Sequence, residues 1–224
     1  MAGVYAVIVA AGRGARMGAA VNKVLLPLRG KPVLRRTAEA FVGCPGVDGA
    51  VVVAAREELG DVRRALDGMP GIVGVVPGGD VRQRSVRNGL AALPADARIV
   101  LVQDGARPFT SQRLIQDCIA AVEQFGSAVA CSRVTDTIKT VGEHLRITGT
   151  PDRATLWAAQ TPQVFPAAAY RQALALPDDY TDDSARMEAF GISVAVVQGH
   201  YENIKVTTPI DLVVAEAIWK ERRL

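Results

Sequence analysis

Histidine, cysteine and aromatic side chains are scarce in this sequence. The two histidines, His144 and His200, lie far apart, and neither has a cysteine or a second histidine at metal-ligand spacing. The three cysteines are an odd number without such spacing, which predicts buried thiols in a reducing compartment. Aromatic residues make up 5% of the chain, too few for a surface that stacks nucleic-acid bases. These shortages argue against a histidine-based metal site and against nucleic-acid binding.

Long apolar runs and concentrated charge are also absent. No apolar stretch is long enough to cross a bilayer, and the opening MAGVYAVIVAAG lacks the basic start of a secretory signal. The net charge is only +3, and the basic residues are spread along the chain except in the C-terminal KERRL. We therefore expect a cytoplasmic enzyme or binding protein with no membrane or nucleic-acid partner. Scattered basic residues suit a small anionic ligand.

Short β-branched runs alternate with helical patterns along most of the chain. Continuous apolar runs of this kind are typical of strands that helices cover on both faces. The alternation predicts an α/β protein with a Rossmann-like, mostly parallel sheet. The expected strands are 4–10, 49–55, 71–77, 97–104, 127–134 and 192–199, and the expected helices are 31–43, 56–68, 81–93, 111–126 and 208–224.

The alternation stops at about residue 133. Residues 135–153 alternate polar and apolar side chains around Gly142 and Glu143, which predicts a β-hairpin with too few large apolar residues to form a core. A hairpin that cannot bury itself often packs against a second subunit. Because no linker, repeat or low-complexity tract divides the chain, we expect a single domain, 1–224, with a dimerisation arm at about 133–153.

A glycine-rich loop, VAAGRGARMG at residues 9–18, follows the first expected strand. Its G-x-G-x-x-x-G spacing differs from the dinucleotide fingerprint, and no acidic residue follows where a ribose ligand is expected. The Gly-Lys-Ser/Thr ending of a P-loop is missing too. Small residues at Ala10 and Ala11 let a nucleotide approach the backbone, while Arg16 and Lys23 add positive charge suited to a transferring phosphorus. The alternative is a solvent-exposed turn.

Further stretches follow this loop in a set order. They are NKVLLPLRGKPVL, GGDVRQRSVRNGL (78–90), VQDGARPF (102–109), TDTIK (135–139), WAAQTPQVF (157–165), YTDDSA (180–185) and GHYENIKVTTPIDL (199–212). Over almost the whole chain, the ordered set resembles the 2-C-methyl-D-erythritol 4-phosphate cytidylyltransferase family of the non-mevalonate isoprenoid pathway. The resemblance implies a nucleotide-diphospho-sugar transferase type of fold with a protruding hairpin arm. It also implies transfer of CMP from CTP to the polyol phosphate, Mg²⁺ held mainly by the CTP phosphates, and a homodimer.

The resemblance also assigns roles to the matching positions. The residues that it places around the nucleotide are Ala10, Ala11, Gly12, Gly79, Asp80, Arg82, Ser85, Asp104 and Gly105. Those that it places around the acceptor are Asp104, Arg107, Thr137, Arg153, Thr161 and Lys205. It implies that Arg16 and Lys23 stabilise the pentavalent phosphorus, and that Arg153 and Lys205 orient the acceptor phosphate. Thr137 and Arg153 would reach the site of the neighbouring subunit.

Some positions are also informative by themselves. Asp104 ends an expected parallel strand, where ligands collect in open α/β sheets. Arg107, beside it, offers paired donors that suit a phosphate. Thr181 and Asp182 fit a helix N-cap, and His200 is interpreted as a structural or surface residue.

A phosphate monoester is largely dianionic at neutral pH, so the reaction needs no dedicated general base.

The sequence departs from the family at a few positions. Asn22 and Val24 flank Lys23 where many relatives have proline and glutamine, which predicts a loop of different stiffness. Gln103 and Gly105 stand where histidine and alanine are frequent, and we expect Gly105 to loosen that turn. The open alternatives are a cytidylyltransferase for another polyol phosphate, such as ribitol 5-phosphate, and a non-catalytic nucleotide-binding regulator. A sugar-1-phosphate nucleotidyltransferase is disfavoured because the chain is short.

Overall fold

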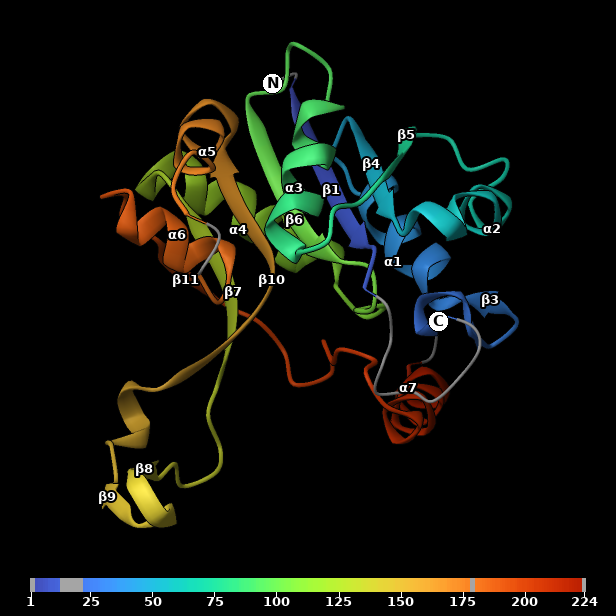
Figure 1. Ribbon diagram of the computed structural model, residues 1–224. Coiled ribbons are helices and arrows are strands. Elements are labelled where there is room, and N and C mark those ends of the chain that lie inside the picture. Colours follow the sequence, from blue (N-terminus) through green and yellow to red (C-terminus); the bar gives the residue numbers. More distant parts are fainter. Residues whose placement is uncertain (1–2, 13–21, 178–179, 223–224) are drawn as a thin grey trace.

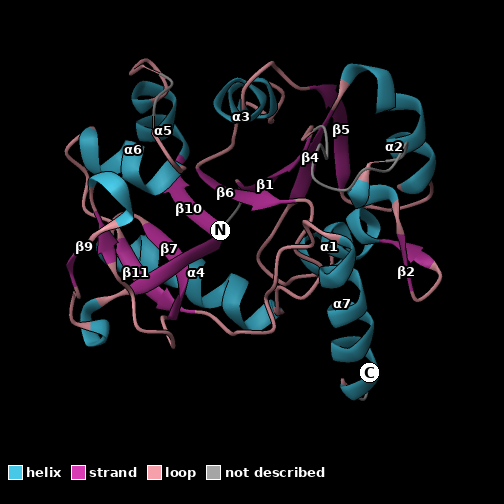
Figure 2. Cartoon of the chain, turned by 60° about the horizontal axis from the view of Figure 1, so that its bottom comes forward, coloured by secondary structure: helices cyan, strands magenta, loops and turns pink. Residues whose placement is uncertain are grey.

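The computed structural model describes residues 3–12, 22–177 and 180–222. A seven-stranded sheet in the order β11-β7-β10-β6-β1-β4-β5 forms its centre, with helices on both faces (Figures 1 and 2). The strands are β1 (Val4–Ala10), β4 (Gly49–Ala54), β5 (Ile72–Pro77), β6 (Ile99–Asp104), β7 (Ala128–Arg133), β10 (Trp157–Pro166) and β11 (Ala195–Gln198). The helices are α1 (Val33–Val42), α2 (Leu59–Ala65), α3 (Arg82–Ala91), α4 (Gln112–Phe125), α5 (Ala167–Ala173), α6 (Asp183–Ala189) and α7 (Pro209–Glu221).

The sheet is mostly parallel, as the sequence predicts. Strand β1 pairs in parallel with β4 and β6, and β4 pairs in parallel with β5. Strand β10 is antiparallel to both of its neighbours, β6 and β7. The parallel strands β1, β4 and β6 end at one edge of the sheet, and residues at this edge form the site described below.

Alternate residues of β1 explain the two layers of helices. Ala6 and Ile8 face the core formed with α1, α2 and α4, whereas Tyr5 and Val7 face the core formed with α3, α5 and α6. Because both faces are buried, the strand is apolar throughout, which is the pattern that predicts a parallel sheet. The three cysteines are free and buried in this structure, as expected.

Three segments depart from the simple alternation of parallel strands and helices. Residues 23–32 form a 3₁₀ helix at Lys23–Leu25 and then β2 (Pro27–Leu28), which pairs with β3 (Lys31–Pro32). The expected helix at 56–68 divides into a 3₁₀ turn at Arg56–Glu58 and α2. The apolar stretch near residue 160 becomes the ten-residue strand β10, which interrupts the parallel order of the sheet.

Helices α4, α6 and α7 begin with a side-chain cap. The Asp182 side chain accepts a hydrogen bond from the Ala185 N–H, which confirms the predicted N-cap of α6. Helix α7 begins with a capping box in which Thr208 and Asp211 bond each other's backbone. None of the helices in the described part of the chain has the length and apolar character of a membrane span.

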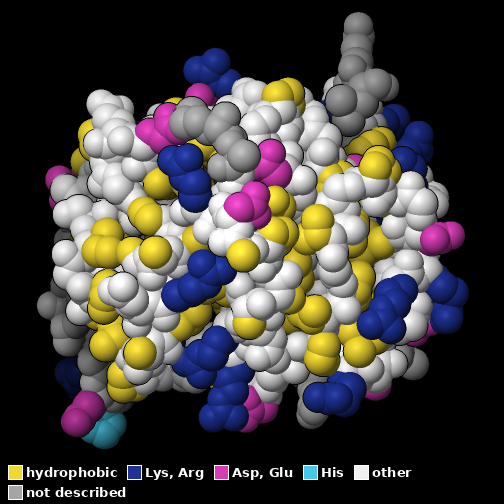
Figure 3. Space-filling view, turned by 90° about the horizontal axis from the view of Figure 1, so that it is seen from above, with side chains coloured by type: hydrophobic (Ala, Val, Ile, Leu, Met, Phe, Trp, Pro, Cys, Tyr) yellow, Lys and Arg dark blue, Asp and Glu magenta, His cyan; other side chains and the backbone are white. Residues whose placement is uncertain are grey.

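The expected hairpin projects from the sheet between β7 and β10 (Figure 1). Its strands β8 (Thr140–Val141) and β9 (Ile147–Gly149) are antiparallel and are joined through a 3₁₀ turn at Glu143–Leu145. Apolar side chains on this arm are exposed, Leu145 to 90%. The face of the molecule seen in Figure 3 carries apolar, basic and acidic side chains intermixed.

Candidate active site

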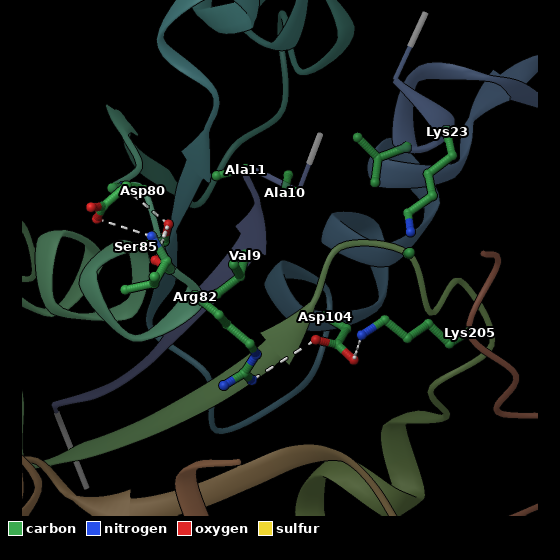
Figure 4. Close-up of a pocket in the computed structure, with 14 residues that line it drawn as sticks. Val9, Ala10, Ala11, Lys23, Asp80, Arg82, Ser85, Asp104 and Lys205 are labelled. Atoms are coloured by element: carbon green, nitrogen blue, oxygen red, sulfur yellow. Dashed lines mark hydrogen bonds and ion pairs between the residues drawn. The ribbon is translucent and has the colours of Figure 1, made fainter. Parts of the chain in front are cut away.

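A pocket of about 380 Å³ lies where β1 and β6 end and α3 begins (Figure 4). Its volume is in the range of small-ligand sites in proteins. The pocket brings together predicted residues from distant parts of the chain, as a topological switch point in an open sheet does. These residues are Ala10, Ala11, Gly12, Lys23, Gly79, Asp80, Arg82, Ser85, Asp104 and Lys205.

The turn before α3 is built around two glycines. A Cβ on Gly78 would lie 2.5 Å from the Ala11 Cβ, and one on Gly79 would lie 2.4 Å from the Arg84 Cβ. Glycine therefore lets this turn close against the β1 loop and against its own helix. The Ser85 hydroxyl accepts a hydrogen bond from the Gly79 N–H at 3.1 Å and donates to the Val81 carbonyl at 3.2 Å. In this arrangement the hydroxyl holds the turn that forms the pocket wall.

The Asp104 carboxylate is the centre of the site's electrostatics. Its oxygens lie 2.9 Å from Lys205 Nζ, 3.4 Å from Arg107 Nε and 3.9 Å from Arg82 Nη2. The side chain is 11% exposed. Burial alone would raise the pKa of Asp104, but the nearby Lys205, Arg82 and Arg107 outweigh it, so the pKa lies below its ordinary value. Asp104 is therefore ionised at neutral pH, with cations on both oxygens.

Arg107 and Thr161 hold Asp104 in place from outside the pocket lining. Arg107 Nη1 donates to the Asn203 carbonyl at 2.7 Å, and its side chain is 12% exposed. The Thr161 hydroxyl accepts a hydrogen bond from the Asp104 N–H at 3.1 Å. Asn203, whose side chain no sequence pattern singles out, donates to the Thr161 carbonyl at 2.9 Å and so ties the Lys205 segment to β10. Its only signal is its place in the stretch 199–212.

Gly105 packs the end of β6 against β1. Its N–H donates to the Val9 carbonyl at 2.8 Å, and a Cβ there would lie 3.2 Å from the Ala10 Cβ. The residue is buried and does not line the pocket. The missing side chain thus allows a close contact between two strand ends, and the loosening of the turn stays a prediction.

Asn22 fixes the segment that carries Lys23. Its side chain accepts a hydrogen bond from the Val24 N–H, and it donates to Glu58 Oε2 at 2.7 Å and to the Ala10 carbonyl at 3.3 Å. The asparagine is 5% exposed. Hydrogen bonds to the 3₁₀ turn, to the end of β1 and to Glu58 thus hold the segment that carries Lys23.

The other predicted site residues are elsewhere. Thr137 and Arg153 are exposed on the arm and do not line the pocket of their own chain. Arg153 Nη1 donates to the Thr135 carbonyl at 2.6 Å. His200 is exposed, and its carbonyl accepts a hydrogen bond from Gln160 Nε2, which agrees with its structural interpretation. Arg16 lies outside the described residues.

Comparisons with known proteins agree over nearly the full chain. A family model described as 2-C-methyl-D-erythritol 4-phosphate cytidylyltransferase (IspD) matches residues 4–221. A protein of that name from Syntrophotalea carbinolica is 46% identical over 222 residues, which is 96% of this chain and 95% of the relative. One from Synechococcus sp. (strain CC9902) is 44% identical over 222 residues, covering 97% of this chain and 98% of the relative.

Solved structures give the same result for the fold. The 4-diphosphocytidyl-2C-methyl-D-erythritol synthase of Anaerococcus prevotii superposes with a TM-score of 0.88 at 29% identity, covering 97% of this chain and 96% of that one. The 2-C-methyl-D-erythritol 4-phosphate cytidylyltransferase of Francisella tularensis gives 0.79 at 29% identity, covering 97% and 99%. The α/β sheet with its small hairpins is thus the architecture of those proteins.

Asp104→Asn should lower the free energy of unfolding by about 1–3 kcal/mol at neutral pH, because it removes the carboxylate that pairs with the largely buried Arg107. The pKa of Asp104 is lower in the folded than in the unfolded protein. Its stabilisation is therefore present above the unfolded value of about 3.9 and is lost as the pH falls through the folded value. Denaturant unfolding at several pH values should show that the difference in free energy of unfolding between wild type and variant becomes smaller below about pH 4.

Asp80→Asn is the control. It changes a carboxylate that is 67% exposed, so the free energy of unfolding should change little. If the difference in free energy of unfolding between wild type and Asp104→Asn were the same at every pH, this role of Asp104 would be contradicted.

Proposed function

The chain belongs to the 2-C-methyl-D-erythritol 4-phosphate cytidylyltransferase family, and on this basis we propose how its pocket carries out the reaction. The enzyme transfers CMP from CTP to 2-C-methyl-D-erythritol 4-phosphate and releases pyrophosphate, in the non-mevalonate isoprenoid pathway. One observation carries the assignment of roles. The pocket is lined by three cationic side chains, Lys23, Arg82 and Lys205, and by the loop of small residues after β1. Positive charge and accessible backbone therefore face the same cavity.

CTP would occupy the side of the pocket formed by the β1 loop and the start of α3. Ala10, Ala11 and Gly12 offer backbone without large side chains, and Gly79 with Ser85 forms the facing wall. The amino end of α3 presents N–H groups and a positive dipole end, which favour phosphate oxygens. Lys23, held by the Asn22 segment, would contact the triphosphate.

The acceptor would bind beside Lys205, with its phosphate directed at the α-phosphorus of CTP. An oxygen of the dianionic phosphate forms the new bond to that phosphorus, and the bond to the β-phosphate oxygen breaks with release of pyrophosphate. Charge accumulates on the α-phosphate oxygens, so Lys23 and Arg16 would stabilise the transition state. Asp104 would hold Lys205 in position for the acceptor.

Mg²⁺ would be held mainly by the CTP phosphates. No three His, Cys, Asp or Glu side chains gather into an ion site within the described ranges, and cations face both Asp104 oxygens. These protein residues alone thus do not fit a magnesium centre. Bound with the nucleotide, the ion would neutralise phosphate charge.

Pyrophosphate release tests the acceptor. Purified enzyme with CTP and Mg²⁺ should release pyrophosphate with 2-C-methyl-D-erythritol 4-phosphate at least about 100-fold faster than with ribitol 5-phosphate, because missing or misplaced hydroxyls leave polar groups of the site unpaired. Faster release with ribitol 5-phosphate would overturn the acceptor assignment. CTP binding without release with either acceptor would favour the non-catalytic regulator.

Lys23→Ala should lower kcat by about 10²–10³-fold while weakening equilibrium CTP binding less than about 10-fold, because its charge acts most strongly in the transition state. Single-turnover kinetics and CTP titration of the same preparation measure the two quantities. The control is Lys31→Ala, an exposed lysine that pairs with Glu39 on the surface. Equal losses in binding and in turnover would contradict the role of Lys23.

We further propose that the arm at 133–153 joins two subunits and places Thr137 and Arg153 in the partner's pocket. The exposed Leu145, Ile147 and Val141 support this, because apolar side chains on a projecting hairpin are commonly covered by another chain. The position of Arg153 outside its own chain's pocket also supports it.

Mixing inactive variants tests this arrangement. A dimer of one Lys23→Ala and one Arg153→Ala subunit contains one site with neither change, so random mixing should restore about a quarter of wild-type activity. Lys23→Ala mixed with Lys205→Ala is the control and should stay inactive, because both residues belong to the same pocket. No recovery in the first mixture, with mixed dimers confirmed by differential tags, would contradict arm exchange.

A further inference from the structure

Arg82 is held in the pocket by a carboxylate that lies behind it. Arg82 Nη1 donates to Asp183 Oδ2 at 2.5 Å, while Nη2 lies 3.9 Å from Asp104 Oδ1. The guanidinium is thus shared between a carboxylate in the pocket and a fully buried one outside it. We propose that Asp183 is a positioning residue that holds Arg82 away from Asp104 and directs it toward the nucleotide phosphates. This inference rests on the proposed binding of CTP in this pocket.

The position of Arg82 in its helix makes a counter-ion necessary. It is the first residue of α3, whose first turn carries no acidic side chain. A cation at this end is repelled by the positive end of the helix dipole, so the charge of Arg82 by itself destabilises α3. Asp183 and Asp104 compensate for this. Burial would lower the pKa of Arg82, but the two carboxylates outweigh it and raise the pKa, so the guanidinium stays charged.

Asp183 is itself fixed from the side away from the pocket. The Tyr170 hydroxyl, buried on α5, donates to Asp183 Oδ1. The start of α6 is anchored to β10, because Gln163 Nε2 donates to Asp182 Oδ2 at 2.9 Å and Gln163 Oε1 accepts from the Ser184 N–H at 2.9 Å. A carboxylate held by two neighbouring elements gives Arg82 one orientation.

The distances indicate what removing Asp183 would do. Lys205 lies 2.9 Å from Asp104 and Arg82 only 3.9 Å, so Lys205 holds Asp104 more closely (Figure 4). Among the residues that the structure describes, Asp104 is the other carboxylate paired with Arg82. The guanidinium would then close on Asp104, compete with Lys205 and withdraw from the space for phosphate. Nucleotide binding would weaken although Asp183 never contacts the nucleotide.

Asp183→Asn tests this, with Asp182→Asn as the matched control. Both variants change a carboxylate at the start of α6, but Asp182 caps the helix, whereas the ion pair with Arg82 is made by Asp183. We expect Asp183→Asn to raise KM for CTP about tenfold with kcat changed less than about threefold. Asp182→Asn keeps a capping side chain and should leave KM for CTP within about twofold of wild type.

A double-mutant cycle with Arg82→Ala separates positioning from a purely structural role. If Asp183 acts through Arg82, then Arg82→Ala with Asp183→Asn should have the KM for CTP of Arg82→Ala alone. The proposal would be overturned if the double variant showed the product of the two single increases in KM for CTP. An unchanged KM for CTP in Asp183→Asn would overturn it too. Should Asp183→Asn fail to unfold cooperatively, Asp183→Glu replaces it in the same cycle, with a smaller shift in the same direction. Failure of the wild type to bind CTP would instead refute the proposed function, and with it this inference.

Discussion

The pairing of one buried carboxylate with cations from separate segments organises this molecule's pocket. Asp104 ends β6, Arg107 follows it in the loop, Arg82 begins α3 and Lys205 precedes α7. Buried ion pairs contribute little to net stability, because desolvation offsets their attraction. What they do here is fix cations before a ligand arrives, so a polyanionic substrate meets positive charge that is already oriented. The Thr161 hydroxyl, which accepts from the Asp104 N–H, and the Gly105 N–H, which donates to the Val9 carbonyl, keep the end of β6 in that position.

Local patterns predict the sheet and the location of the site. Apolar runs such as Val4–Ala10 are long and buried on both faces, and parallel strands place their carboxyl ends at one edge. The sequence alone therefore indicates that Asp104 lies near the loop after the first strand, together with the residues that the family resemblance adds. Strand β10 is less predictable, because an apolar stretch contains no information on whether its neighbours run parallel or antiparallel.

The finer roles cannot be derived from the sequence because they depend on contacts between distant residues. The sequence predicts that Arg107 grips phosphate, yet this arginine donates to the Asn203 carbonyl, and only the packing of the 199–206 segment near the end of β6 brings the two together. The close approach of Gly105 to Ala10 is likewise a contact that no local pattern indicates. Asp183 has no signal beyond its place in the stretch 180–185 and beside a helix cap. In each case the contacting residue is distant in the sequence, and a periodic pattern gives information only on residues that are near one another in the chain.

The roles assigned to these residues all require that CTP binds against the β1 loop and the start of α3, with the Asp104 cluster at its phosphates. Hydrogen–deuterium exchange of the wild-type enzyme with and without CTP and Mg²⁺ tests this most directly. We expect slower exchange in peptides covering residues 9–12, 79–85 and 104–106, and little change along α7. Protection confined to other parts of the sheet, or none at saturating CTP, would contradict it.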